Sequence, residues 1–140
     1  MNSPGKLLIA VVDDDESVCR ALGRLVRSLG MDAQTFARGR EFVDLLEAAP
    51  SFNPDCVVLD IQMPDLNGIE TQNEIRRWRP RLPVIFITAH DEPDARTRAI
   101  AGGAVAFLRK PFDDALFIHT LTVALPRNVQ DKEGDTHHGA

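Results

Sequence analysis

The chain has 140 residues, of which 44% are hydrophobic and 26% charged, a composition typical of one globular domain with a single core. Its net charge is −5 and it has no basic stripe interleaved with aromatic residues, which argues against nucleic acid as a direct ligand. The apolar run at 7–12 is too short for a signal peptide or a membrane span, so we expect no membrane association and a cytoplasmic location.

Five short apolar segments along the chain have the composition of β-strands. They occur at 7–12, 33–37, 56–60, 84–88 and 104–108. The first, third and fourth are almost continuously apolar, as in strands that are buried on both faces of a parallel sheet. The second has mixed polarity and suits the edge of the sheet.

Segments with helical spacing of apolar residues alternate with these strands. They occur at 16–30, 39–49, 67–78, 91–103 and 112–125. The first closes on Gly30, which favours a C-terminal cap, and the last can begin at Asp113 or Asp114. Five alternations in this length predict an α/β fold, an open doubly wound parallel sheet with five helices on its two faces.

Three features have more ordinary interpretations. The polar segment 127–140, which contains two histidines, is expected to be a disordered tail after a domain at 1–126. The basic cluster at 76–81 is interpreted as a solvated helix end whose cations complement the helix dipole, with a partner-binding patch as the alternative. Cys19 and Cys56 lie in apolar patterns and are expected to be buried thiols in a reducing compartment.

Polar side chains stand at the carboxyl ends of four predicted strands. They are Asp13, Asp14 and Asp15 after the first strand, Asp60 at the third, Thr88 at the fourth and Lys110 after the fifth. Neighbouring parallel strands lie about 5 Å apart, so these groups can converge on one site. Clustered carboxylates suit Mg²⁺ (Mn²⁺ is also possible), while a lysine and a hydroxyl can bind an oxyanion. This combination predicts phosphoryl transfer, with Asp60 as the nucleophile and Asp13 and Asp14 at the metal.

The sequence resembles the receiver domain of two-component response regulators over about residues 6–125. The motifs that carry the resemblance are "VVDDDESV", "VVLDIQMPDLNGIE", "VIFITAHDE" and "GGAVAFLRKPF". The fourth and fifth strand segments look most like regulators of the nitrogen-fixation transcription-factor subfamily. The resemblance implies a flavodoxin-like fold with strand order 2-1-3-4-5, and a phosphoryl donor that is a histidine kinase or a histidine phosphotransfer protein.

The resemblance also implies roles for the residues at the strand ends. Asp60 would be the phosphoacceptor. Asp13, Asp14 and Asp60 would hold Mg²⁺ together with the backbone carbonyl of Gln62. Lys110 would pair first with the acceptor and then with the phosphoryl oxygens.

Further positions would report or adjust the phosphorylated state. Thr88 would turn its hydroxyl toward the phosphoryl group, and Phe107 would be the aromatic switch that moves inward when the threonine shifts. Gln62 and His90 would overhang the site and tune the phosphoryl lifetime. Pro111 is a candidate for a cis peptide bond. A downstream protein or a second copy of the chain would bind the surface formed by the fourth helix, fifth strand and fifth helix.

Two departures from the family pattern concern the third helix and the turn after the fourth. Thr71, Gln72 and Asn73 occupy positions where leucines are frequent, and Gly102 stands where alanine is usual. From these substitutions we expect the third helix to pack less tightly than in the family.

Other functions are compatible with parts of this pattern. Taken singly, the acids at 13–15 could cap a helix, Asp60 could build a turn, and Thr88 could be an ordinary strand residue. A phosphatase of the haloacid dehalogenase type also uses a strand-end aspartate, and an Asp-x-Asp-x-Ser pattern does occur at 13–17. In that family the last metal-binding acids follow the threonine and lysine, whereas Asp60 and Asp65 precede both here.

Two further alternatives retain the receiver fold. The chain could be an interaction module that no longer takes phosphate, or the receiver fragment of a longer transcription factor. We expect a stand-alone regulator that is no enzyme, beyond stoichiometric self-phosphorylation and slow self-dephosphorylation.

Overall fold

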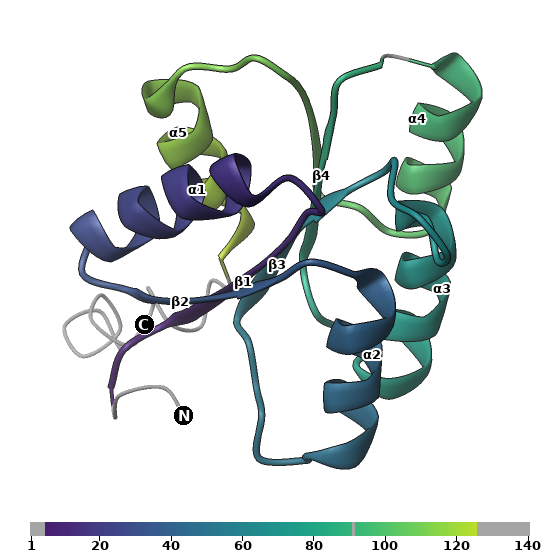
Figure 1. Ribbon diagram of the computed structural model, residues 1–140, viewed down its shortest axis with the longest axis horizontal. Coiled ribbons are helices and arrows are strands. Elements are labelled where there is room, and N and C mark those ends of the chain that lie inside the picture. Colours follow the sequence, from purple (N-terminus) through teal and green to yellow (C-terminus); the bar gives the residue numbers. More distant parts are fainter. Residues whose placement is uncertain (1–4, 91, 126–140) are drawn as a thin grey trace, which may run out of the picture.

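The chain alternates strictly between strand and helix in a computed structural model that describes residues 5–90 and 92–125 (Figure 1). The strands are β1 Leu8–Val12, β2 Asp32–Phe36, β3 Cys56–Asp60, β4 Val84–Thr88 and β5 Ala106–Arg109. The helices are α1 Glu16–Ser28, α2 Gly39–Ala48, α3 Gly68–Trp78, α4 Pro93–Ala101 and α5 Asp114–Ala124. The tail predicted at 127–140 lies outside the described residues. Within these ranges no helix combines the length and the apolar character that a membrane crossing needs.

The strands form one parallel sheet in the order β2-β1-β3-β4-β5, which confirms the predicted flavodoxin-like topology. Every residue of β1, β3 and β4 is buried, as their continuous apolar sequences predict. Strand β2 lies at an edge and is partly exposed, also as predicted. The fifth strand begins at Ala106, two residues later than the sequence pattern indicates.

Helices cover both faces of the sheet and enclose two apolar clusters. Figure 1 shows α1 and α5 on one face and α2, α3 and α4 on the other. Strand residues alternate between the clusters, so that Ala10 and Val12 face α2–α4 while Ile9 and Val11 face α1 and α5. Burying one large apolar side chain contributes about 1.5–3 kcal/mol, so both layers stabilise the sheet.

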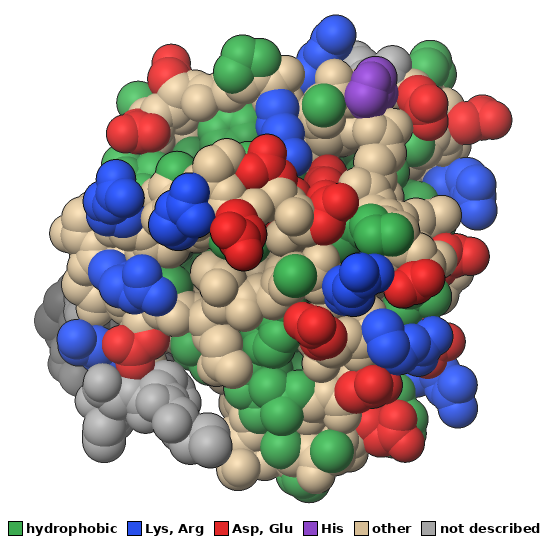
Figure 2. Space-filling view, viewed as in Figure 1, with side chains coloured by type: hydrophobic (Ala, Val, Ile, Leu, Met, Phe, Trp, Pro, Cys, Tyr) green, Lys and Arg blue, Asp and Glu red, His purple; other side chains and the backbone are tan. Residues whose placement is uncertain are grey.

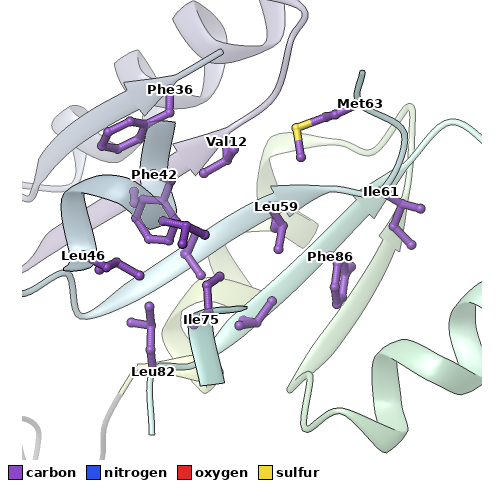
Figure 3. Packing of buried hydrophobic residues seen from close by; sticks show 14 of the residues in the cluster. Val12, Phe36, Phe42, Leu46, Leu59, Ile61, Met63, Ile75, Leu82 and Phe86 are labelled. Atoms are coloured by element: carbon purple, nitrogen blue, oxygen red, sulfur yellow. The ribbon is translucent and has the colours of Figure 1, made fainter. Parts of the chain in front are cut away.

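The cluster beneath α2 and α3 contains three aromatic rings in edge-to-face contact, two of which, Phe36 and Phe42, are labelled in Figure 3. The ring centroid of Phe36 lies 5.2 Å from that of Phe42 and 6.0 Å from that of Phe52. Edge-to-face pairs add about 0.5–1.5 kcal/mol to the burial of the rings. These contacts hold the edge strand β2 and helix α2 against the centre of the sheet.

Local capping signals decide where the helices begin and end. Asp15 caps α1, and Asp113 rather than Asp114 caps α5, each through its carboxylate. Asn67 and Glu70 form a reciprocal capping box at α3. Gly30, with a φ of +83°, follows the end of α1 in the left-handed conformation that glycine adopts readily.

Helix α3 packs closely against its neighbours through two of the polar residues that depart from the family pattern. Thr71 and Gln72 are 0% and 1% exposed, and each faces a glycine. A β-carbon at Gly39 would overlap the Thr71 hydroxyl, and one at Gly102 would lie 2.7 Å from Cδ of Gln72. The amide of Gln72 also donates a 3.0 Å hydrogen bond to the carbonyl of Ala99. The side chains of Thr71 and Gln72 thus have room because the residues opposite them are glycines, which carry no side chain.

The basic cluster at 76–81 is only partly solvated, which corrects its interpretation as a solvated helix end. Arg76 donates hydrogen bonds to the carbonyls of Leu82 and Gly102, at 2.8 and 3.1 Å. Arg79 donates to carbonyls in the segment between α2 and β3. The side chain of Arg77, by contrast, is 68% exposed. Two of these arginines therefore tie loops together instead of facing water.

Candidate functional site

The carboxyl ends of the strands bring the predicted polar residues together. Asp13 follows β1, Asp60 ends β3, Thr88 ends β4 and Lys110 follows β5. Carboxylate oxygens of Asp13, Asp14 and Asp60 lie within 4.8 Å of one another. In the space-filling view, acidic side chains gather near the middle of the face that contains these strand ends (Figure 2).

The three acids after β1 have different environments. Asp13 is 1% exposed, and its Oδ1 accepts a 2.9 Å hydrogen bond from the backbone of Asp15. Asp14 is exposed beside it. Asp15 turns away to cap α1, where hydrogen bonds from Ser17 lower the pKa of its carboxyl. Asp13 and Asp14 therefore remain as metal-ligand candidates, while Asp15 has a structural role.

Lys110 inserts its ammonium group between the two buried carboxylates. Its Nζ lies 2.9 Å from Oδ2 of Asp13 and 3.7 Å from Oδ1 of Asp60. Burial alone would lower the pKa of Lys110, but the hydrogen bond to Asp13 and the charge of Asp60 raise it above its ordinary value. The lysine is therefore a permanent cation in the site. The Lys110–Pro111 peptide bond is cis, the geometry expected from the resemblance.

The carboxyl group of Asp60 is poorly solvated and close to other acids. Asp60 is 4% exposed, and burial together with the charge of Asp13 raises its pKa to about 7, although Lys110 acts in the opposite direction. One lysine does not balance the three carboxylates at this point. The donor set, oxygen atoms with excess negative charge, fits a hard divalent cation such as Mg²⁺.

Two loops above the strand ends are joined through side chains to which the family resemblance assigns roles in the site. Thr88 is fully buried, and its hydroxyl donates a 2.8 Å hydrogen bond to the carbonyl of His90 and accepts a 3.1 Å one from its N–H. Nδ1 of His90 lies 2.6 Å from Oε1 of Gln62. The loop after β4 is thereby joined to the loop after β3 beside Asp60.

Phe107 lies on β5, half-buried between the sheet and α4. Its ring centroid is 6.3 Å from that of Phe86, and the guanidinium of Arg96 stacks over the ring at 4.8 Å. Such a cation–π contact is worth about 0.5–1 kcal/mol at an exposed site. Phe107 thus contacts both the core of the sheet and a helix of the expected output surface.

Sequence patterns did not reveal two residues that shape the loop after Asp60. A β-carbon at Gly68 would lie 2.5 Å from the carbonyl oxygen of Asp60, so only glycine lets α3 begin this close to the acceptor strand. Asp65 has a φ of +65° and pairs with Arg38 at 2.9 Å. The Asn67-Gly68 dipeptide signals a turn, but not which backbone it approaches.

Comparison with known proteins gives one consistent result. The family model described as "Response regulator receiver domain" matches residues 9–122. Nodulation protein W of Bradyrhizobium diazoefficiens is 37% identical over 128 residues, which cover 91% of this chain and 55% of that protein. The DNA-binding transcriptional regulator NtrC of Salmonella typhimurium is 40% identical over 131 residues, 88% of this chain and 27% of that protein. The chain thus spans about half the length of the first of these relatives, and less of the second.

Solved structures agree with the match to the family model. A response regulator receiver protein from Burkholderia phymatum is 54% identical, with a TM-score of 0.76 over 85% of this chain and 94% of that one. The chemotaxis protein CheY4 of Vibrio cholerae is 26% identical, with a TM-score of 0.77 over 86% and 100% of the two chains. Receiver domains are signalling domains and not classical enzymes, so the phosphatase alternative is not supported. The chain belongs to the response regulator receiver domain family.

Proposed function

We propose that Asp60 accepts a phosphoryl group from a phosphohistidine of a histidine kinase or a histidine phosphotransfer protein. An oxygen of its carboxylate attacks phosphorus and forms a P–O bond while the P–N bond breaks, and the electron pair of that bond returns to the imidazole. The observation that carries the proposal is the cluster of Asp13, Asp14 and Asp60 with Lys110 in contact.

The same cluster supports a metal requirement. Asp13, Asp14, Asp60 and the backbone carbonyl of Gln62 are the residues that we propose hold Mg²⁺, or Mn²⁺ in its place. When bound, the metal neutralises negative charge on the phosphoryl and acceptor oxygens. Lys110, whose Nζ lies 2.9 Å from Asp13 and 3.7 Å from Asp60, would also neutralise charge on the phosphoryl oxygens. Deprotonated Asp60 is the reactive form, so its raised pKa makes these cations important near neutral pH.

Phosphorylation would act on the rest of the molecule through Thr88. We propose that its hydroxyl leaves the carbonyl of His90 and donates to a phosphoryl oxygen, which frees the loop before α4 and opens space for Phe107 to turn inward. The two arrangements form an equilibrium that phosphorylation biases. The surface of α4, β5 and α5 would then bind a downstream protein or a second copy of the chain.

The lifetime of the phosphoryl group would depend on the side chains above it. The hydrogen bond between Gln62 and His90 joins the two loops beside Asp60 and would limit the access of water to the aspartyl phosphate. The reaction is stoichiometric, with slow self-dephosphorylation and no turnover of a separate substrate. A cytoplasmic location is part of this proposal, and the two free buried cysteines suit a reducing compartment.

The test is the intact mass of the protein after incubation with acetyl phosphate, with and without Mg²⁺. We expect one phosphoryl adduct that requires Mg²⁺ and is lost in Asp60→Asn. Asp65→Asn, which removes an exposed carboxylate from the following loop, is the matched control and should keep the adduct. No adduct under any condition would favour an interaction module that does not take phosphate. Continuous release of phosphate would favour a phosphatase.

A further inference from the structure

Helix α4 has little apolar contact with the rest of the protein. Among the described residues of α4 only Ala95 and Ala99 are buried, and alanine has the smallest apolar side chain that can contact the sheet. At its start, Glu92 occupies the N-cap position without a side-chain hydrogen bond to the first turn. Two alanines provide far less buried area than the larger apolar side chains that each of the other helices buries. Something other than apolar burial must therefore hold this helix in place.

Polar side chains of α3 hold the opposite end of α4, and Figure 1 shows the two helices side by side. Nε2 of Gln72 donates a 3.0 Å hydrogen bond to the carbonyl of Ala99. Nε of Arg76 donates to the carbonyl of Gly102 at 3.1 Å, and Nη2 donates to that of Gly103 at 3.3 Å. The carbonyl of Ala99 also accepts a 3.0 Å hydrogen bond from the backbone N–H of Ala104, whereas the carbonyls of Gly102 and Gly103 lie past the end of α4, where the helix itself supplies no partner.

The geometry of this attachment is rigid. Arg76 also donates a 2.8 Å hydrogen bond to the carbonyl of Leu82, so its planar guanidinium joins the turn after α4 to the segment before β4. Gln72 is 1% exposed and fills the space beside the backbone of Gly102. Neither side chain can move far without breaking several contacts at once.

The other end of α4 is connected to the candidate site. The loop that leads into it carries His90, whose backbone makes two hydrogen bonds with the hydroxyl of Thr88. Near its start, Arg96 stacks over Phe107. A rearrangement of Thr88 would therefore reach the N-terminal end of α4 directly, whereas the C-terminal end is held by α3.

We propose that Gln72 and Arg76 form a polar clamp that fixes the C-terminal end of α4, so that events at Asp60 turn the helix about this fixed end. The turning of the helix rests on the proposed phosphoacceptor function; the clamp does not. The N-terminal half of α4 would then carry most of the change to the output surface.

Amide hydrogen exchange of the whole chain, followed by mass spectrometry, tests the turning movement. The protein is compared in Mg²⁺ alone and in Mg²⁺ with beryllofluoride, which copies the charge and shape of a phosphoryl group. We expect the exchange of residues 92–97 to change and that of residues 99–104 to stay the same. Equal changes in both segments would overturn the fixed end.

Two substitutions in the clamp, with one control substitution beside them, test the clamp without any ligand. Arg76→Lys keeps the charge but lacks the planar guanidinium whose separate nitrogens reach three carbonyls, and we expect exchange of the amides at 102–104 to become roughly tenfold faster. Arg77→Lys is the matched control on the exposed side of the same helix and should leave exchange there unchanged. Gln72→Met, which keeps the side-chain length but cannot donate to Ala99, should act like Arg76→Lys. Unchanged exchange in both clamp variants would refute the proposal.

The outcomes separate the clamp from the proposed function. If beryllofluoride alters no segment of the protein, the phosphoacceptor function and the turning movement both fail, while the ligand-free comparison still decides the clamp. If Arg76→Lys unfolds, as circular dichroism would reveal, Gln72→Met decides it. Faster exchange across the whole chain in both variants, and not at 102–104 in particular, would mean that they only lower global stability and would count against the clamp.

Discussion

The ammonium group of Lys110 is closer to Asp13 than to the candidate acceptor Asp60. Its Nζ lies 2.9 Å from Oδ2 of Asp13 and 3.7 Å from Oδ1 of Asp60. The lysine thus compensates a carboxylate that we assign to the metal, and both acids are almost fully buried. Two buried acids beside a single lysine leave the ligand-free site with excess negative charge, which makes its stability sensitive to substitution and to pH.

Replacing Lys110 by methionine should destabilise the protein. The change keeps the apolar stem and leaves Asp13 and Asp60 without their cation, for which we expect a loss of about 2 kcal/mol in the free energy of unfolding at pH 7. Urea denaturation with a chelator present measures it. The matched control is Arg24→Met, which removes an exposed cation of α1 and should change the value by less than about 0.5 kcal/mol. Equal losses in the two variants would contradict the structural role of Lys110.

The raised pKa of Asp60 predicts a pH dependence that Asp60→Asn removes. A folded-state pKa of about 7, against a usual 3.8, means that the folded protein binds the proton more tightly than the unfolded chain. The contribution of Asp60 to the free energy of unfolding is fully present below about pH 4 and is lost as the pH rises through 7. One pKa unit corresponds to about 1.4 kcal/mol, so the shift of Asp60 can change the free energy of unfolding by at most roughly 4 kcal/mol. We expect about half of that change.

Urea denaturation between pH 5 and 8, again with a chelator, measures this slope. The wild-type protein should lose stability across that range, and Asp60→Asn should lose much less. Asp65→Asn, which removes an exposed acid, should keep the wild-type slope. An unchanged slope in Asp60→Asn would show that a different group titrates.

A double-mutant cycle tests the complementary fit of Gln72 and Gly102. Gly102 has a φ of −82°, which alanine adopts freely, so the cost of Gly102→Ala comes from overlap with Gln72 and should be about 1–3 kcal/mol. In a Gln72→Ala background that cost should vanish, because the overlapping atoms are absent. The comparison is Asn73→Ala, at an exposed position of the same helix, with which Gly102→Ala should be additive. If the free-energy effects of Gly102→Ala and Gln72→Ala were also additive, the complementary fit of the two residues would be refuted.

The hydrogen bond between Gln62 and His90 predicts that the two side chains act as one unit on the phosphoryl lifetime. Gln62→Ala or His90→Ala should each shorten the life of the adduct by a factor of roughly three to ten, the size expected for one lost hydrogen bond. The double variant should be no faster than either single one. The decay of the adduct, followed by intact mass after removal of the phosphodonor, measures this. If the factor for the double variant were the product of the two single factors, the two residues would act separately.

Much of the fold and the site follows from local patterns. The apolar runs identify β1, β3 and β4 because strands buried on both faces need apolar side chains throughout. Parallel strands end at one edge of the sheet, so the residue that follows each strand predicts the members of the site. Asp13, Asp60, Thr88 and Lys110 can be identified in this way from the sequence alone.

Environment and partner choice could not be predicted in this way. The sequence does not show that Lys110 lies nearer Asp13 than Asp60, or which of the acids at 13–15 caps α1. Both depend on how the loops after the strands pack against the sheet. Side-chain charge alone carries no such information.

The alternation of strands and helices and the members of the acidic site can be inferred from the sequence, because both depend on the periodicity of side chains along one element and on the residue after it. The role of the polar face of α3 depends instead on how the helices pack against one another. Gln72 and Arg76 bind carbonyls that lie 27 and 26 residues further along the chain. Every residue has the same backbone carbonyl, so the sequence does not indicate which carbonyls will lie within hydrogen-bond distance of Gln72 and Arg76. That depends on how the helices pack.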